Sequence, residues 1–142
     1  MTIQVRTIAA SPEVLLRQVL PECLKEDGEP TSLTFEPWRR VDQGGLSVDR
    51  ESLTTAERAF VLFTMPPPDG FGQQSVEVRG VSVEEACSLD LVVVEDPVAA
   101  TATSPADPAH ALIDFNSLAR NRWGKVAKRL KGFALTRGRL YP

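Results

Sequence analysis

Apolar residues near the end of the chain recur at spacings of three and four, the repeat of one face of an α-helix. The stripe consists of Ala119, Trp123, Val126, Ala127, Leu130, Phe133 and Ala134. The rest of the circumference is basic, and its cations are Arg120, Lys125, Lys128 and Lys131, with Arg122 and Arg129 beside the stripe. This pattern predicts an amphipathic helix from about Ser117 to Leu135.

Alternating or β-branched apolar runs predict strands in the rest of the chain. We expect these strands at Ile3–Ile8, Thr31–Phe35, Leu46–Val48, Ser75–Val81 and Ala109–Phe115. The run Leu91–Val94 has no polar residue, which favours a central strand covered on both faces.

Helix-start patterns interrupt these strands at three places. Ser11 followed by Pro12 is typical of a helix N-terminus and predicts a helix over Val14–Val19. T-x-x-E at 54–57 and S-x-x-E at 82–85 have the capping-box spacing. They predict a helix over about Thr55–Thr64 and a short helix after Ser82.

These elements together predict an α+β fold. We expect residues 1–142 to form a single compact domain with a mixed or mostly antiparallel sheet of about five strands. The C-terminal amphipathic helix and two or three shorter helices would pack against this sheet. The small, proline-containing segment Val98–Pro108 is expected to be a surface loop, either passive or acting as a lid.

Composition narrows the class of protein. With 42% hydrophobic and 25% charged residues, the chain is neither collagenous, mucin-like nor wholly disordered. No apolar run approaches the roughly 18 residues that span a bilayer, and the first residues lack the features of a secretory signal. We therefore expect a cytoplasmic protein without a membrane partner. Cys23 and Cys87 have no CxxC spacing or histidine cluster, so free thiols and no metal site are expected, with a disulfide as the alternative.

Charge is distributed unevenly along the chain. Residues 1–116 hold 8 Lys and Arg against 19 Asp and Glu, a net −11, whereas residues 117–142 hold 8 against none, a net +8. An acidic body followed by a basic segment indicates an anionic partner, bound by the helix through Arg120, Lys125, Lys128 and Lys131. Two alternatives remain: an ordinary solvated helix face, or docking of the helix on the acidic body of the same molecule.

A second candidate site is the loop and strand start between Trp38 and Arg50. Its possible anion-binding groups are Arg39, Arg40, Gly44, Gly45 and Arg50, because guanidinium groups and glycine N–H groups suit a phosphate. The segment has neither a P-loop nor a GxGxxG sequence, and its arginines could instead pair with nearby carboxylates.

His110 is the only histidine. On a strand it would lie about 13 Å from Asp114, too far for a hydrogen bond. A catalytic or ligand-binding role would therefore need a partner from elsewhere in the chain, and a structural hydrogen bond is the alternative. We assign no catalytic group, and no cofactor is expected.

Two functions are compatible with these features. The first is a non-enzymatic interaction protein, such as an adaptor, inhibitor or immunity-type protein, that binds another protein; nucleic acid is a further possible partner of the basic helix. The second depends on GGLSV after an arginine-containing loop, a strand that begins near His110, and the basic terminal helix. In these features the chain resembles small bacterial toxins of the ADP-ribosyltransferase type. The resemblance implies a nucleotide-binding enzyme in which Arg39, Arg40 or Arg50 would hold a pyrophosphate and His110 would orient the ribose or base. The glutamate expected of that family has no identifiable counterpart.

Overall fold

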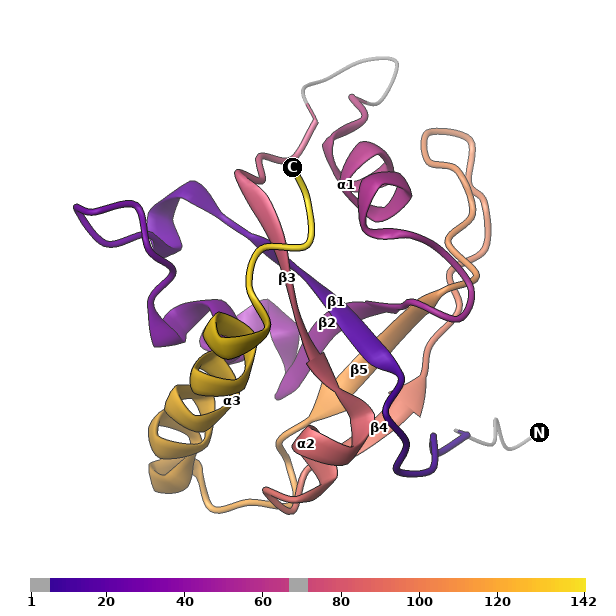
Figure 1. Cartoon of the computed structure of the whole chain (residues 1–142). Helices are drawn as coiled ribbons and strands as arrows, with labels where there is room; N and C mark the ends of the chain where they lie inside the picture. The colour runs from indigo at the N-terminus through magenta and orange to yellow at the C-terminus, as the bar shows by residue number, and fades with distance from the viewer. Residues whose placement is uncertain (1–5, 67–71) are drawn as a thin grey trace.

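A five-stranded antiparallel sheet forms the centre of the protein (Figure 1). The structure is a computed structural model that describes residues 6–66 and 72–142. The strands lie in the order β3-β1-β2-β5-β4, and each pair of neighbours is antiparallel. Their bounds are β1 Val14–Val19, β2 Gly45–Arg50, β3 Glu77–Ser82, β4 Val92–Glu95 and β5 His110–Asp114. The expected α+β fold and strand number are confirmed.

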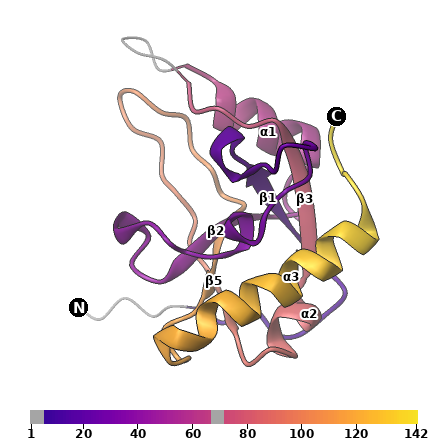
Figure 2. The same ribbon diagram turned by 90° about the vertical axis from the view of Figure 1, so that its left-hand side faces the viewer.

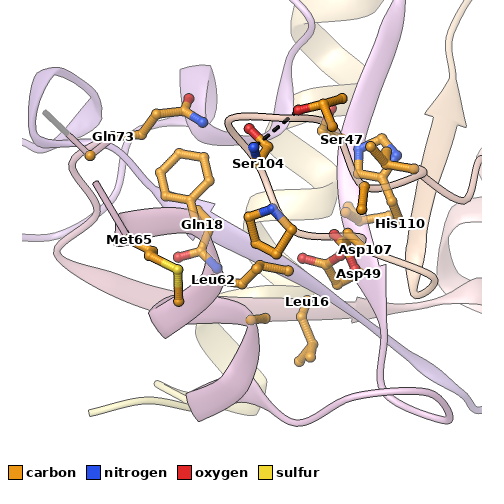
Figure 3. Close-up of a pocket in the computed structure, with 18 of the residues that line it drawn as sticks. Leu16, Gln18, Ser47, Asp49, Leu62, Met65, Gln73, Ser104, Asp107 and His110 are labelled. Atoms are coloured by element: carbon orange, nitrogen blue, oxygen red, sulfur yellow. Dashed lines mark hydrogen bonds between the residues drawn. The ribbon is translucent and has the colours of Figure 1, made fainter. Parts of the chain in front are cut away.

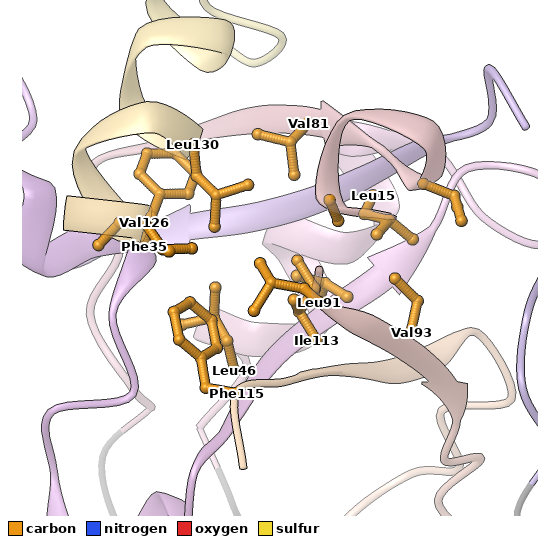
Figure 4. Packing of buried hydrophobic residues seen from close by; sticks show 14 of the residues in the cluster. Leu15, Phe35, Leu46, Val81, Leu91, Val93, Ile113, Phe115, Val126 and Leu130 are labelled. Carbon is orange, nitrogen blue, oxygen red and sulfur yellow. The ribbon is translucent and has the colours of Figure 1, made fainter. Parts of the chain in front are cut away.

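The larger core lies between the sheet and α3, Trp123–Arg137 (Figures 2 and 4). Inward-facing residues of the sheet meet the apolar stripe of the helix and the 3₁₀-helix η2, Ser32–Phe35. The buried side chains labelled in Figure 4 are Leu15, Phe35, Leu46, Val81, Leu91, Val93, Ile113, Phe115, Val126 and Leu130. The short helix α2, Val83–Cys87, adds Val83 and Ala86 to the same core. Its capping box is confirmed, because the Ser82 hydroxyl accepts a hydrogen bond from the Glu85 N–H and the Glu85 carboxylate accepts one from the Ser82 N–H.

A smaller core lies on the opposite face of the sheet. The helix α1, Ala56–Thr64, packs against β1 and β3 through a cluster around Leu16, Ala59 and Val78. The chain after α3 crosses to this face, where the Tyr141 ring lies 5.1 Å from the Phe60 ring. This cluster is centred on β1 and β3, so α1 does not cover the same face of β2 and β5.

The predicted helix over Val14–Val19 is wrong, because this segment is β1, paired on both sides. Leu15 and Leu16 are both buried but face opposite layers, as strand geometry requires. The Ser11 hydroxyl accepts a hydrogen bond from the Glu13 N–H in a local turn and starts no helix. Burial on both faces of the sheet therefore outweighs the local helix-start pattern.

Two further predictions need correction. Ser32–Phe35 in the expected strand Thr31–Phe35 is the 3₁₀-helix η2. The strand β4 ends the sheet order and is not central, and Val92 is 37% exposed. Its outer edge pairs with residues 6–8, the described part of the expected strand Ile3–Ile8. The remainder of that strand lies outside the described residues.

Two helix starts are displaced from their expected positions. The N-cap of α1 is Thr55, whose hydroxyl accepts a hydrogen bond from the Arg58 N–H, and not Thr54. The last helix begins at Trp123 after a 3₁₀ turn, Arg120–Arg122, and ends at Gly138, whose φ is 92°. The expected apolar stripe is otherwise confirmed, except that Ala119 is exposed and precedes the helix.

Candidate functional site

A cleft of about 820 Å³ lies on the α1 side of the sheet (Figure 3). Its walls are α1 and the loop between β4 and β5, which stand side by side in Figure 1. Residues of β1, β2 and β5 also line it. Concave sites of this size with apolar walls and a few polar groups are typical places for small ligands.

The loop that forms one wall is closed at its base. Val98 and Asp107 exchange two backbone hydrogen bonds, of 2.9 Å and 2.8 Å. At its tip the Thr101 hydroxyl accepts hydrogen bonds from the N–H groups of Thr103 and Ser104. The predicted surface loop at Val98–Pro108 is therefore an ordered hairpin-like wall of the cleft.

Arg17 occupies the place where two strands separate. The strands β1 and β2 pair at only two positions, the last of which is Leu16 opposite Asp49. Beyond this point the Arg17 side chain donates hydrogen bonds to the backbone carbonyls of Ser47 and Thr34, at 3.0 Å and 2.8 Å. Burial lowers the pKa of Arg17 to about 10, so the guanidinium remains charged at neutral pH. Among the described residues no carboxylate lies within 4 Å to neutralise it.

Gln18 adds an unpaired amide to the cleft. The residue is 6% exposed, and both its Nε2 and its Oε1 are buried without a hydrogen-bond partner. Figure 3 shows this side chain among the lining residues, next to Leu62. A buried amide without partners destabilises the fold by about 1 to 3 kcal/mol. A ligand that forms hydrogen bonds with this amide would explain why it is kept in the fold.

Two carboxyl groups meet at the other end of the cleft. Asp49 on β2 and Asp107 in the loop lie side by side in Figure 3. Asp49 Oδ1 is buried without a hydrogen-bond donor. Burial and the adjacent Asp107 carboxyl raise the pKa of Asp49 to about 8. At neutral pH the two carboxyl groups therefore share one proton.

His110 stands directly opposite Asp49 in the β2–β5 pair and also lines the cleft. Its Nδ1 lies 3.0 Å from both the backbone carbonyl and a carboxylate oxygen of Asp96. The histidine thus has a carboxylate partner from elsewhere in the chain, as a functional role would require. Asp114 is engaged with Asn116, because its carboxylate accepts two hydrogen bonds of 2.9 Å from the backbone and side-chain N–H groups of Asn116.

The predicted anion-binding set is divided by the fold. Arg39 lines the cleft but also pairs with Asp42 at 3.3 Å. Arg40 is exposed on the 3₁₀-helix η3, Arg40–Asp42. Arg50 lies apart from the cleft-lining residues.

Arg50 and the glycine pair have structural partners. The Arg50 guanidinium forms 2.9 Å ion pairs with Glu13 and Glu95. Gly44 has a left-handed φ of 82° and packs against the Asn116 amide, and Gly45 begins β2. Arg39 and His110 therefore line one cleft, whereas the other four predicted residues do not.

A second candidate surface is the outer face of α3 and the turn before it. Six cations make up this surface, which we call the cationic face: Arg120, Arg122, Lys125, Lys128, Arg129 and Lys131. In the described part of the chain, none of the six has a carboxylate within 4 Å. The other two basic residues of this region do pair, Arg137 with Glu85 at 2.8 Å and Arg139 with Glu77 at 3.5 Å. The acidic body thus neutralises only the C-terminal end of the basic segment.

Apolar groups accompany the cationic face. The Arg120 guanidinium carbon lies 4.1 Å from the centre of the Trp123 ring, a cation–π contact. Leu33, on the 3₁₀-helix that packs against α3, is 40% exposed. A surface that combines arginine with exposed apolar side chains has the composition of a protein interface.

The sequence analysis missed the groups that define the cleft. Arg17 and Gln18 are adjacent polar residues inside the apolar run Val14–Val19, and that arrangement could have marked them once the run was interpreted as a strand. Asp49 and Asp107 are separated by 57 intervening residues, so only the fold brings them together.

Neither cysteine forms a disulfide: Cys23 is a buried free thiol and Cys87 a partly exposed one. Within residues 6–66 and 72–142, no three His, Cys, Asp or Glu side chains are grouped as metal ligands. No helix in these ranges has the length and apolar character needed to cross a membrane. Comparisons with known proteins give no match to a family model, a curated protein or a solved structure.

Proposed function

We propose that the protein is a non-enzymatic interaction protein, of the adaptor, inhibitor or immunity type, whose cationic face binds an acidic surface of another protein. The observation that carries the proposal is the set of six cations on and just before α3 that have no carboxylate partner among residues 6–66 and 72–142. Their charge is available to a partner because, of the eight terminal cations, Glu85 and Glu77 pair only with Arg137 and Arg139 among the described residues.

Helix geometry supports a contact surface of useful size. The 15 residues of α3 extend over roughly 22 Å. Lys125, Lys128 and Arg129 are exposed within two turns of the helix. α3 is held against the sheet by Val126, Ala127 and Leu130. A rigid row of cations can steer an acidic partner and select it by charge complementarity.

An acidic protein fits this surface better than nucleic acid. The two aromatic residues of α3, Trp123 and Phe133, are wholly or partly buried against the core and cannot act as stacking platforms. Leu33 instead offers an apolar contact next to the cations. The acidic body, at −11, would also repel a long polyanion that extended past the helix. The two free thiols support action in a reducing compartment such as the cytoplasm.

The test compares two labelled probes, an oligoglutamate peptide and a duplex DNA of equal total charge, by fluorescence anisotropy at low and high salt. The charge-reversal variant carries Lys125→Glu, Lys128→Glu and Lys131→Glu. Its matched control carries Lys25→Glu, Arg40→Glu and Arg58→Glu, three exposed positions away from α3 with the same change in net charge.

We expect the natural chain and the control to bind the peptide at low salt, and the charge-reversal variant to bind it at least about tenfold more weakly. Circular dichroism should show that all three proteins fold alike. Equal loss of binding in the control would mean that net charge alone matters and would refute a localised face. Tighter binding of the DNA than of the peptide would show that the partner is nucleic acid and not an acidic protein.

A further inference from the structure

Among the residues that the structure describes, the cleft on the α1 side has a cation without an acidic partner, an unpaired amide and a carboxyl pair. We propose that it binds a short zwitterionic peptide of dipeptide size, with the peptide carboxylate at Arg17, the ammonium group at Asp49 and Asp107, and the peptide amide at Gln18. This site is separate from the cationic face, which lies on the other side of the sheet, so it is independent of the function proposed above.

The carboxylate end follows from the guanidinium of Arg17. Two of its N–H groups are used by the carbonyls of Ser47 and Thr34, which fix the side chain in one position. Guanidinium has five N–H donors, so three remain. A carboxylate is the planar acceptor that matches such a fork, and Arg39, which pairs with Asp42, also lines the cleft.

The ammonium end follows from the carboxyl pair. Asp49 Oδ1 has no donor of its own, and Asp107 is the adjacent carboxyl group. An ammonium group with three N–H donors can satisfy both carboxylates, and it would take the place of the proton that they share in the free protein. His110, directly opposite Asp49, is already engaged with Asp96.

The amide of Gln18 distinguishes a peptide from a free amino acid. Its Nε2 and Oε1 are a donor and an acceptor that are both buried and unpaired. A peptide group presents a carbonyl acceptor and an N–H donor and can satisfy both. Leu62, Phe63 and Met65 of α1 and its C-cap line the adjacent wall, which suits apolar side chains of the ligand.

The spacing of the two charged ends sets the ligand length. Arg17 binds the carbonyl of Ser47, and Asp49 is two residues further along β2, a rise of roughly 7 Å. An extended dipeptide spans at most about 7 Å, and hydrogen bonds at both ends add reach. A single amino acid would be too short to engage both ends, and a long peptide would have to place a charged terminus elsewhere.

The experiment measures binding of three dipeptides, Ala-Leu, Leu-Ala and Leu-Leu, by calorimetry and thermal shift. Each is compared with its N-acetylated form, its C-amidated form and with AMP. The protein variants are Gln18→Met, which keeps the volume but removes the amide, and Asp107→Asn. Asp90→Asn, at an exposed left-handed position that tolerates asparagine, is the control.

At a concentration of 100 times its Kd, a binding dipeptide should raise the Tm by about 5 to 11 °C. Each blocked form should bind at least about tenfold more weakly, as should Gln18→Met and Asp107→Asn, while Asp90→Asn binds normally. The proposal is wrong if no dipeptide binds at millimolar concentration, if acetylated and amidated forms bind as well as free ones, or if AMP binds in their place. Because Gln18→Met should fold at least as stably as the natural chain, its loss of binding would not reflect unfolding.

Discussion

The carboxyl pair predicts an unusual dependence of stability on pH. The pKa of Asp49 is about 8 in the folded protein, against a reference value of 3.8. Between these pH values the folded state holds a proton that the unfolded chain releases. Stability from this group is therefore complete at low pH and is lost as the pH rises through about 8.

Asp49→Asn should remove this dependence, because an asparagine N–H can donate to the Asp107 carboxylate at any pH. One titrating group changes the free energy of unfolding by at most about 1.4 kcal/mol per pH unit. Relative to the variant, the natural chain should therefore lose on the order of 2 to 4 kcal/mol of unfolding free energy between about pH 5 and about pH 8. At higher pH the difference between the two proteins should stay constant.

Urea unfolding followed by tryptophan fluorescence at a series of pH values measures this difference. His110 faces the pair in both proteins, so its contribution largely cancels when the variant is subtracted from the natural chain. Asp90→Asn supplies the same chemical change at an exposed site and should follow the natural chain at every pH. If Asp49→Asn also runs parallel to the natural chain from about pH 5 to about pH 9, then the two carboxyl groups share no proton.

Three further substitutions test interactions that stabilise the fold. Gln18→Met should raise the free energy of unfolding by about 1 to 3 kcal/mol, since it removes two buried polar atoms without partners; a drop in urea midpoint would contradict this. Gly44→Ala should lower the free energy of unfolding by about 1 to 3 kcal/mol, because Gly44 has a φ of 82° and a Cβ there would collide with Asn116. An unchanged Tm would show that this loop is free to move. Arg50→Gln breaks both ion pairs of a largely buried guanidinium and should lower stability by about 1 to 3 kcal/mol at low salt, measured by the same urea titration; no change would assign the pairs a negligible role.

Local patterns in the sequence determined the elements whose stability is local. The stripe from Trp123 to Ala134 has helical spacing and became the buried face of α3. The capping box from Ser82 to Glu85 consists of hydrogen bonds within one turn of helix, so its formation does not depend on distant segments. The separation of negative body and positive end is likewise a property of the sequence. Within the part of the chain that the structure describes, two of the eight terminal cations form ion pairs.

Tertiary structure decided what depends on distant partners. Val14–Val19 carries a helix-start pattern yet is a strand, because its two faces are buried in different cores. β4 is apolar yet lies at the end of the sheet order, since its position depends on which strands β5 pairs with.

The cleft depends wholly on such distant contacts. It exists because β1 and β2 separate after Leu16 and because α1 packs on only part of one sheet face. Sequence spacing could not reveal the meeting of Asp49 with Asp107 or the position of Arg17 between two strands. Helix periodicity is fixed by neighbours three and four residues away, whereas strand pairing and the shape of a cleft are fixed by segments that meet only when the whole chain has folded.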